Sequence, residues 1–152
     1  MKENSIYGPL LLEVAWEVCN KVGGIYTVIR SKVPYVIERW RDQYCTIGPQ
    51  TTDELPVEFQ PTDDYSDAFG RAVLKMREEG LEVNYGYWLI PGKPKLILFN
   101  INSVRHLLKN IKRDYGQSNE MMFRDDPLVD NVVLFGYMTL QYIRILSSEG
   151  IS

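Results

Sequence analysis

Near its start, the chain runs from an apolar segment through a pair of glycines directly into a helical pattern. Residues 9–16 (PLLLEVAW) are mostly apolar, which is typical of a buried strand. The turn Lys21-Val22-Gly23-Gly24 follows, and after it apolar residues recur at helical spacing. We expect Pro34 to end or kink this helix near Lys32 or Val33, because proline cannot donate the hydrogen bond that a helix interior needs.

The glycine turn has a chemical use. Backbone N–H groups and the positive end of a helix dipole converge where a strand turns into a helix, and open α/β sheets bind ligands at that edge. Lys21 adds a cation beside Gly23 and Gly24, so the turn is a candidate site for a phosphate or diphosphate. The pattern K-x-G-G lacks the spacing of a dinucleotide fingerprint or of a P-loop. The alternative stays open that the glycines only permit a tight turn.

Beyond this turn, strand-like and helix-like segments alternate. The predicted strands are residues 43–48, which Gly48-Pro49 closes, and residues 82–90 and 95–101, which Pro91-Gly92-Lys93-Pro94 separates. The predicted helices are residues 67–79, ended by Gly80; Ser103 to about Tyr115, capped by Ser103; and Pro127 to about Ser148. Residues 49–64 are expected to form a loop, and a polar loop is expected before Asp126. The alternation predicts an α/β fold in which helices are layered on a sheet.

Composition narrows the classes of function. Seventeen Lys and Arg residues against 20 Asp and Glu give a net charge of −3, which argues against a general binder of nucleic acid or of anionic membranes. The cysteines, Cys19 and Cys45, lie far apart, and His106 is the single histidine, so we expect no metal site. No signal-peptide core follows Met1; we therefore expect one cytoplasmic domain with reduced thiols and no membrane partner.

A longer stretch around the turn, residues 13–28 (EVAWEVCNKVGGIYTV), resembles the opening of the glycogen synthases, particularly those of the eukaryotic type. Three further blocks match in the same order: residues 44–49, residues 85–90 with Gly92, and residues 131–136. The resemblance covers about residues 10–148. Tyr87 stands where the family usually has an arginine, and residues 102–126 match no motif of the family.

The resemblance implies a Rossmann-like layered sheet, the incomplete N-terminal domain of a two-domain (GT-B type) glycosyltransferase. Residues 1–152 would be part of that domain, with the nucleotide-sugar-binding domain absent and the main catalytic residues beyond Ser152. The implied activity is a retaining transfer of glucose from UDP-glucose or ADP-glucose to an α-1,4-glucan, without a cofactor. On this basis Lys21, Gly23 and Gly24 are assigned to the donor diphosphate. The alternative is a stand-alone module that binds nucleotide or glucan without catalysis.

Four more side chains are candidates for the glucan. Glu17 lies four residues before Lys21 and has two interpretations: it accepts hydrogen bonds from sugar hydroxyls, or it pairs with Lys21 or with a neighbouring N–H. Tyr85, Tyr87 and Trp88 are candidates for stacking on sugar rings, with a place in the core or on the sheet surface as the alternative.

The last predicted helix, residues 127–148, is apolar on nearly every face. We expect one face to pack on the sheet through Val133, Tyr137 and Leu140. A second face would be left uncovered, and it comprises Leu134, Met138, Ile145 and Leu146. An uncovered apolar face predicts self-association through this helix.

Overall fold

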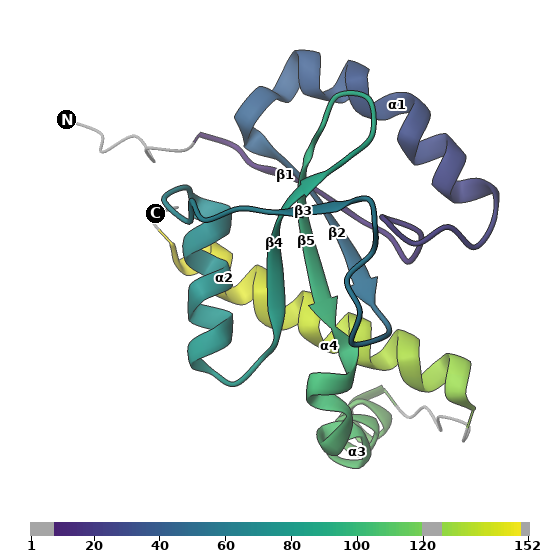
Figure 1. Ribbon diagram of the computed structural model, residues 1–152. Coiled ribbons are helices and arrows are strands. Elements are labelled where there is room, and N and C mark those ends of the chain that lie inside the picture. The colour runs from purple at the N-terminus through teal and green to yellow at the C-terminus, as the bar shows by residue number, and fades with distance from the viewer. Residues whose placement is uncertain (1–7, 120–125, 150–152) are drawn as a thin grey trace.

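The computed structural model describes residues 8–119 and 126–149, which form a five-stranded sheet with helices on both faces (Figure 1). The strands are β1 (Leu11–Val14), β2 (Tyr44–Gln50), β3 (Phe59–Pro61), β4 (Val83–Trp88) and β5 (Lys95–Asn100). Their order across the sheet is β1-β2-β5-β4-β3. β1, β2 and β5 are parallel, whereas β4 is antiparallel to β5 and β3 is antiparallel to β4. The predicted α/β class is confirmed, with a mixed sheet.

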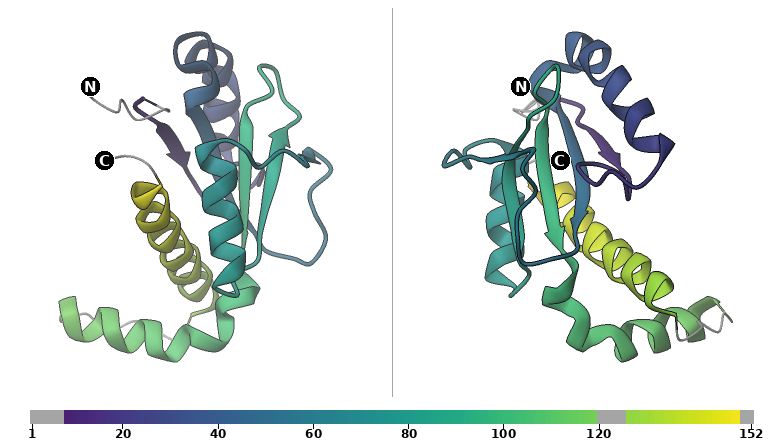
Figure 2. Two further views of the ribbon diagram at one scale, coloured as in Figure 1. Left: turned by 90° about the vertical axis from the view of Figure 1, so that its left-hand side faces the viewer. Right: turned by 45° about the vertical axis from the view of Figure 1, so that its right-hand side comes forward.

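Helices cover the sheet on its two faces. They are α1 (Gly24–Trp40), α2 (Ala68–Glu78), α3 (Leu108–Asn119) and α4 (Pro127–Ser148), with short 3₁₀ helices η1 (Arg41–Gln43) and η2 (Ile101–Leu107). α1 packs on one face against Leu96, Leu98 and Trp88. α2 and α4 lie side by side on the other face, as Figure 2 shows. Every residue of β2 is buried as a result. No helix within the described residues has the length and apolar character to span a membrane.

Several predicted elements are confirmed with small shifts in their bounds: β1, α2, the β4–β5 hairpin and α4. The start of α2 is capped by Asp67, whose Oδ1 accepts a hydrogen bond from the Gly70 N–H over 2.7 Å. Gly80 follows the helix with φ of +84°, a conformation that glycine adopts without strain. The signals that located these elements are local in the sequence, and tertiary packing did not override them.

Two elements continue past their predicted ends. Pro34 does not end α1, which continues to Trp40, because Val33 and Ile37 on either side of it pack against the hairpin turn at Gly92. The alternative for Pro34, a kink, stays a prediction. β2 continues through Gly48-Pro49 to Gln50. The Ile47 carbonyl accepts a hydrogen bond from the Ala15 N–H and therefore points toward β1. Backbone groups two residues apart in a strand point to the same side, so the Pro49 nitrogen also points toward β1. At that level β1 has already ended, at Val14. The N–H that Pro49 lacks therefore has no ladder partner to lose.

Three other expectations need correction. The 49–64 segment contains a strand, β3, which pairs with β4. Ser103 does not cap α3; it lies inside η2, and its hydroxyl donates to the Asn100 carbonyl over 2.7 Å. The polar loop expected from about residue 116 through Asp126 begins later than predicted, because α3 continues to Asn119; residues 120–125 lie outside the described residues.

The faces of α4 are also the reverse of the expected ones. The face buried in the core comprises Leu134, Phe135, Met138, Tyr142 and Leu146. Val133, Tyr137 and Leu140 are only half-buried. The prediction was wrong because nearly every position of α4 is apolar, so periodicity could not choose a face; the contact with α2 decides it.

Candidate functional site

The turn between β1 and α1 lies at the carboxyl edge of the parallel strands. β1 ends at Val14 and α1 begins at Gly24, with Gly23 as its N-cap. Between them the chain passes over β2 at Gly48, where an added Cβ would lie 2.1 Å from the carbonyl oxygen of Val18. Only glycine allows this approach, so Gly48 fixes the height of the turn above the sheet.

Glu17 is bound to the amino end of α1. Its carboxylate accepts a hydrogen bond from the Gly23 N–H, and the residue is only 8% exposed. A carboxylate at this position is favoured by the partial positive charge of the helix end. The second interpretation of Glu17, pairing with a neighbouring N–H, is therefore the one observed. Gly24 is exposed, with open space around its Cα.

Lys21 is exposed beside this helix end, above an aromatic residue of its first turn. Its Nζ lies 5.8 Å from the centroid of the Tyr26 ring. The Tyr26 hydroxyl donates to Glu58 over 2.5 Å, and the indole N–H of Trp88 donates to the same carboxylate over 3.0 Å. Burial, with the hydrogen bond to Glu58, raises the pKa of Tyr26 to about 12. Glu58 thus links the segment between β2 and β3 to both α1 and β4.

Cys19 lies within the turn in a strained conformation, with φ of +52°. It is buried, and burial, together with the nearby Glu58, raises the pKa of its thiol to about 12. The thiol is therefore protonated near neutral pH, which argues against a nucleophilic role.

Comparison with known proteins bears on this turn. Residues 13–150 match the family model of glycogen synthase. The chain belongs to the glycogen synthase family. It is 36% identical over 142 residues to the liver glycogen [starch] synthase of Rattus norvegicus, covering 93% of this chain and 20% of that protein. It is 36% identical over 143 residues to glycogen [starch] synthase isoform 1 of Saccharomyces cerevisiae, covering 88% and 20%.

A further relative is the glycogen [starch] synthase of Caenorhabditis elegans, 33% identical over 138 residues that cover 90% of this chain and 20% of that protein. The chain thus spans about a fifth of the length of these curated relatives. The match includes the whole β1–α1 turn, so the resemblance of residues 13–28 to this family is confirmed as a family relationship.

The aromatic candidates do not gather at the turn. Tyr85 and Trp88 are 3% and 0% exposed and pack on opposite faces of the sheet. As folded, neither offers a ring face to a sugar. Tyr87 is half-buried and lies beside Lys93, whose Nζ is 5.2 Å from its ring centroid, at the hairpin end of β4. Tyr87 therefore lies toward the opposite edge of the sheet from the turn that carries Lys21.

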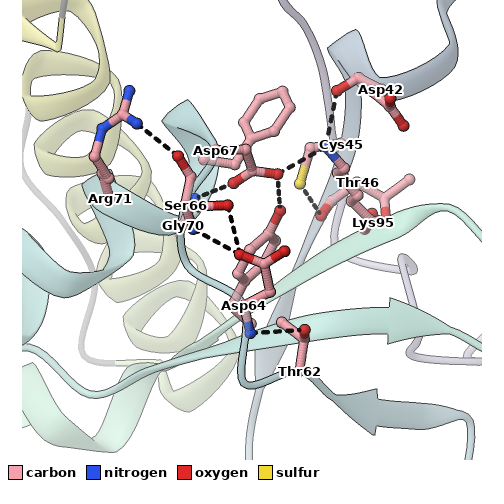
Figure 3. Close-up of polar contacts among 12 residues, drawn as sticks. Asp42, Cys45, Thr46, Thr62, Asp64, Ser66, Asp67, Gly70, Arg71 and Lys95 are labelled. Atoms are coloured by element: carbon pink, nitrogen blue, oxygen red, sulfur yellow. Dashed lines mark hydrogen bonds and ion pairs between the residues drawn. The ribbon is translucent and has the colours of Figure 1, made fainter.

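A polar cluster that the sequence did not reveal lies at the amino end of β5 (Figure 3). Asp67 Oδ2 accepts from the Tyr85 hydroxyl and from Lys95 Nζ, each over 2.7 Å. Lys95 also donates to the Asp42 carbonyl over 3.0 Å. Asp67 thus joins the start of α2 to two neighbouring strands. The signal available in advance was only the capping position of Asp67 before α2.

A second unpredicted cluster lies at the carboxyl edge. The side-chain amide of Asn84 donates to that of Gln50 over 2.7 Å, and Gln50 is 4% exposed. The available signal was an amide side chain in or at the end of a mostly apolar strand: Gln50 ends β2, and the half-buried Asn84 lies in β4. No group of three or more His, Cys, Asp or Glu residues suited to a metal ion occurs in the described part of the chain. The exposed His106 lies in η2.

Proposed function

We propose that this chain is part of a retaining glucosyltransferase that moves glucose from UDP-glucose or ADP-glucose to an α-1,4-glucan. The observation that carries the proposal is the β1–α1 turn, which presents Lys21 and the exposed start of a helix at the carboxyl edge of a sheet, in a chain of the glycogen synthase family. Lys21, Gly23 and Gly24 are the residues proposed to bind the donor diphosphate.

The chemistry of the reaction matches this arrangement. When the bond between glucose and the diphosphate breaks, negative charge grows on the leaving group. Fixed N–H dipoles and a cation at that position lower the barrier, because they are oriented before the charge develops. The Gly23 N–H is already paired with Glu17. The diphosphate would therefore use Lys21 and the first-turn N–H groups from Gly24 onward, which lack partners within the helix.

Fewer side chains are available to contact a glucan than the sequence predicted. Glu17 is buried against the helix end, and Tyr85 is enclosed in the core. Tyr87 is half-buried and is the aromatic residue that we retain as a proposed glucan contact. Tyr87 pairs with Lys95 at the amino end of β5, whereas the turn lies at the carboxyl edge, so we propose that it contacts a bound glucan chain rather than the reacting sugar.

Transfer of label tests the proposal. The protein at its natural length is incubated with radiolabelled UDP-glucose, or with ADP-glucose, and glycogen; we expect incorporation above a boiled control with one of the two donors. Residues 1–152 alone should bind a donor without transferring glucose, because positioning the acceptor needs the facing half of a cleft. Absence of incorporation with both donors would overturn the proposal in favour of a binding module.

We also propose self-association through the 127–148 helix, on a smaller surface than expected. The exposed apolar residues of α4 are Leu128, Val132 and Ile143. Light scattering over a dilution series should show a mass above that of one chain, and the double substitution Leu128→Gln and Val132→Gln should lower it. A mass of one chain at every concentration would contradict this proposal.

A further inference from the structure

A pocket of about 340 Å³ lies at the opposite end of α1 from the proposed donor turn. It is formed where the end of α1, the start of β2 and the β4–β5 turn meet. The 17 residues of α1 separate it from Gly24 by about 25 Å along the helix axis. The residues that matter here are Arg41, Asp42, Tyr87, Gly92 and Lys93.

Two cations in the lining of this pocket are not neutralised. The Arg41 guanidinium is exposed and forms no hydrogen bond or ion pair with any residue that the structure describes. The contact of Lys93 Nζ within the same residues is the face of the Tyr87 ring. A third cation, Lys95, is already held by Asp67 at 2.7 Å. The pocket therefore has two positive groups available to an anion, against one carboxylate, that of Asp42.

The same two residues have unusual backbones. Arg41 has φ of +50° and ψ of −125°, and Lys93 has φ of +44°. Among the described residues other than glycine, the one further positive φ belongs to Cys19 in the donor turn. Glycine would fit these conformations without strain, and such strain is characteristic of ligand-binding positions. Two positions at which glycine would be less strained therefore carry cationic side chains.

The walls of the pocket are also rigidly joined. At Gly92, with φ of +93°, an added Cβ would lie 3.0 Å from Ile37 Cδ1 and 3.2 Å from Val33 Cγ1. The hairpin turn therefore lies directly against α1, with Pro91 and Pro94 on its two sides. This contact fixes the backbone of the hairpin turn relative to α1, so a ligand could bind between Lys93 and Arg41 without a backbone rearrangement.

We propose that this pocket binds a phosphate monoester carried on a ring, with the phosphate between Arg41 and Lys93 and the ring against Tyr87. A guanidinium and an ammonium suit a dianionic phosphate, and the phenol face suits either a pyranose or a nucleobase. The site is separate from the donor turn and does not depend on the activity proposed above.

The first experiment follows backbone amide signals of the isotope-labelled chain during titration with inorganic phosphate, glucose 1-phosphate and uridine monophosphate. Each titration also follows the amides of Gly24 and Tyr26, so that binding at the donor turn is measured separately from binding at this pocket. We expect the amides of Arg41, Gly92 and Lys93 to shift, and one ester to bind more tightly than inorganic phosphate. Which ester does so identifies the ring as sugar or base; equal affinity for all three, or no shift at these amides, would overturn the proposal.

Variants then assign the contacts. Arg41→Ala and Lys93→Ala should each weaken binding of the better ester about tenfold. Tyr87→Leu should reduce it to the level of inorganic phosphate. Asp42→Asn should tighten it, because the opposing carboxylate is removed. Unchanged affinity in Arg41→Ala and Lys93→Ala would show that the cations do not form the site.

Arg41→Gly separates binding from folding. It removes the cation and relieves the positive φ, so we expect Tm to rise by about 3 °C while ester binding falls as in Arg41→Ala. A more stable variant that has lost the ligand cannot have lost it through unfolding. Retained binding in Arg41→Gly would contradict the assignment of the phosphate to this side chain.

Discussion

The carboxylate of Glu17 accepts the hydrogen bond that the Gly23 N–H donates at the amino end of α1. The chain thus supplies its own anion where the proposed donor diphosphate would bind. Glu17 orders the turn before a ligand arrives, and its charge opposes a second anion at the same helix end. A substitution that keeps the hydrogen bond but removes the charge distinguishes the ordering of the turn from the repulsion of a second anion.

Glu17→Gln is the substitution that does so, because the amide oxygen can still accept from the Gly23 N–H. We expect the affinity for UDP to rise by about two- to fivefold, since a like charge beside the diphosphate is lost. Isothermal titration of the chain with UDP measures this. Glu78→Gln, an exposed change on α2, is the matched control and should leave the affinity unchanged. Weaker binding by Glu17→Gln would show that the carboxylate helps to hold the ligand.

Lys21→Ala addresses the charge that develops during transfer. In the protein at its natural length, we expect kcat to fall about 100-fold, corresponding to about 3 kcal/mol, with a smaller rise in KM. Steady-state transfer to glycogen gives both constants. Lys109→Ala, on the exposed side of α3, controls for a general loss of charge. Lys21→Arg is not a neutral control, because its planar guanidinium presents donors differently. Unchanged turnover would reduce Lys21 to a surface cation resting on Tyr26.

The elements that could be predicted from the sequence are those with local signals. The strand before the glycine turn, the cap at Asp67 with Gly80 beyond α2, and the Pro-Gly turn of the hairpin all lie within a few residues of what they determine. β3 could not be predicted in this way: it has three residues in a proline-containing excursion, and pairing with β4 alone defines it as a strand.

The site was predicted as a turn but not as a set of contacts. Nothing local indicates that the Val18 carbonyl approaches Gly48, because the two residues meet only when β1 and β2 pair. Alternation along β4 suggested that some of Tyr85, Tyr87 and Trp88 would be accessible. Helices cover both faces of the sheet, however, so Tyr85 and Trp88 are both enclosed despite their opposite directions.

Asp67→Ala tests the cluster at the amino end of β5. The substitution removes the cap of α2 and leaves the buried Tyr85 hydroxyl and Lys95 without this partner. We expect the free energy of unfolding to fall by about 2–4 kcal/mol, from a lost cap and an unsatisfied buried donor. Urea denaturation measures it. Asp67→Asn should be milder, because an amide oxygen remains at the cap.

A double substitution shows whether Tyr85 acts through Asp67. Tyr85→Phe alone should cost about 1 kcal/mol, and much less in the Asp67→Ala background, where the hydroxyl already lacks its acceptor. Strictly additive costs would mean that the 2.7 Å hydrogen bond between them contributes nothing to stability.

The last prediction concerns pH and the end of α4. Glu149 accepts charged hydrogen bonds from Lys75 and Arg71 of α2, and these, the Lys75 bond foremost, hold the pKa of its carboxyl below the ordinary 4.5. A carboxyl whose pKa is lower in the folded state stabilises the fold fully above its unfolded pKa, and this contribution is lost as pH falls through the folded pKa. Glu149→Gln should therefore lower the free energy of unfolding by less than about 1 kcal/mol near neutral pH, since the group lies near the surface. The difference from the unmodified chain should shrink below pH 4.5 and vanish in strong acid. Urea denaturation across this range, with Glu78→Gln as the control, checks both the size and the sign; a difference that is constant with pH would assign the effect to packing rather than to charge.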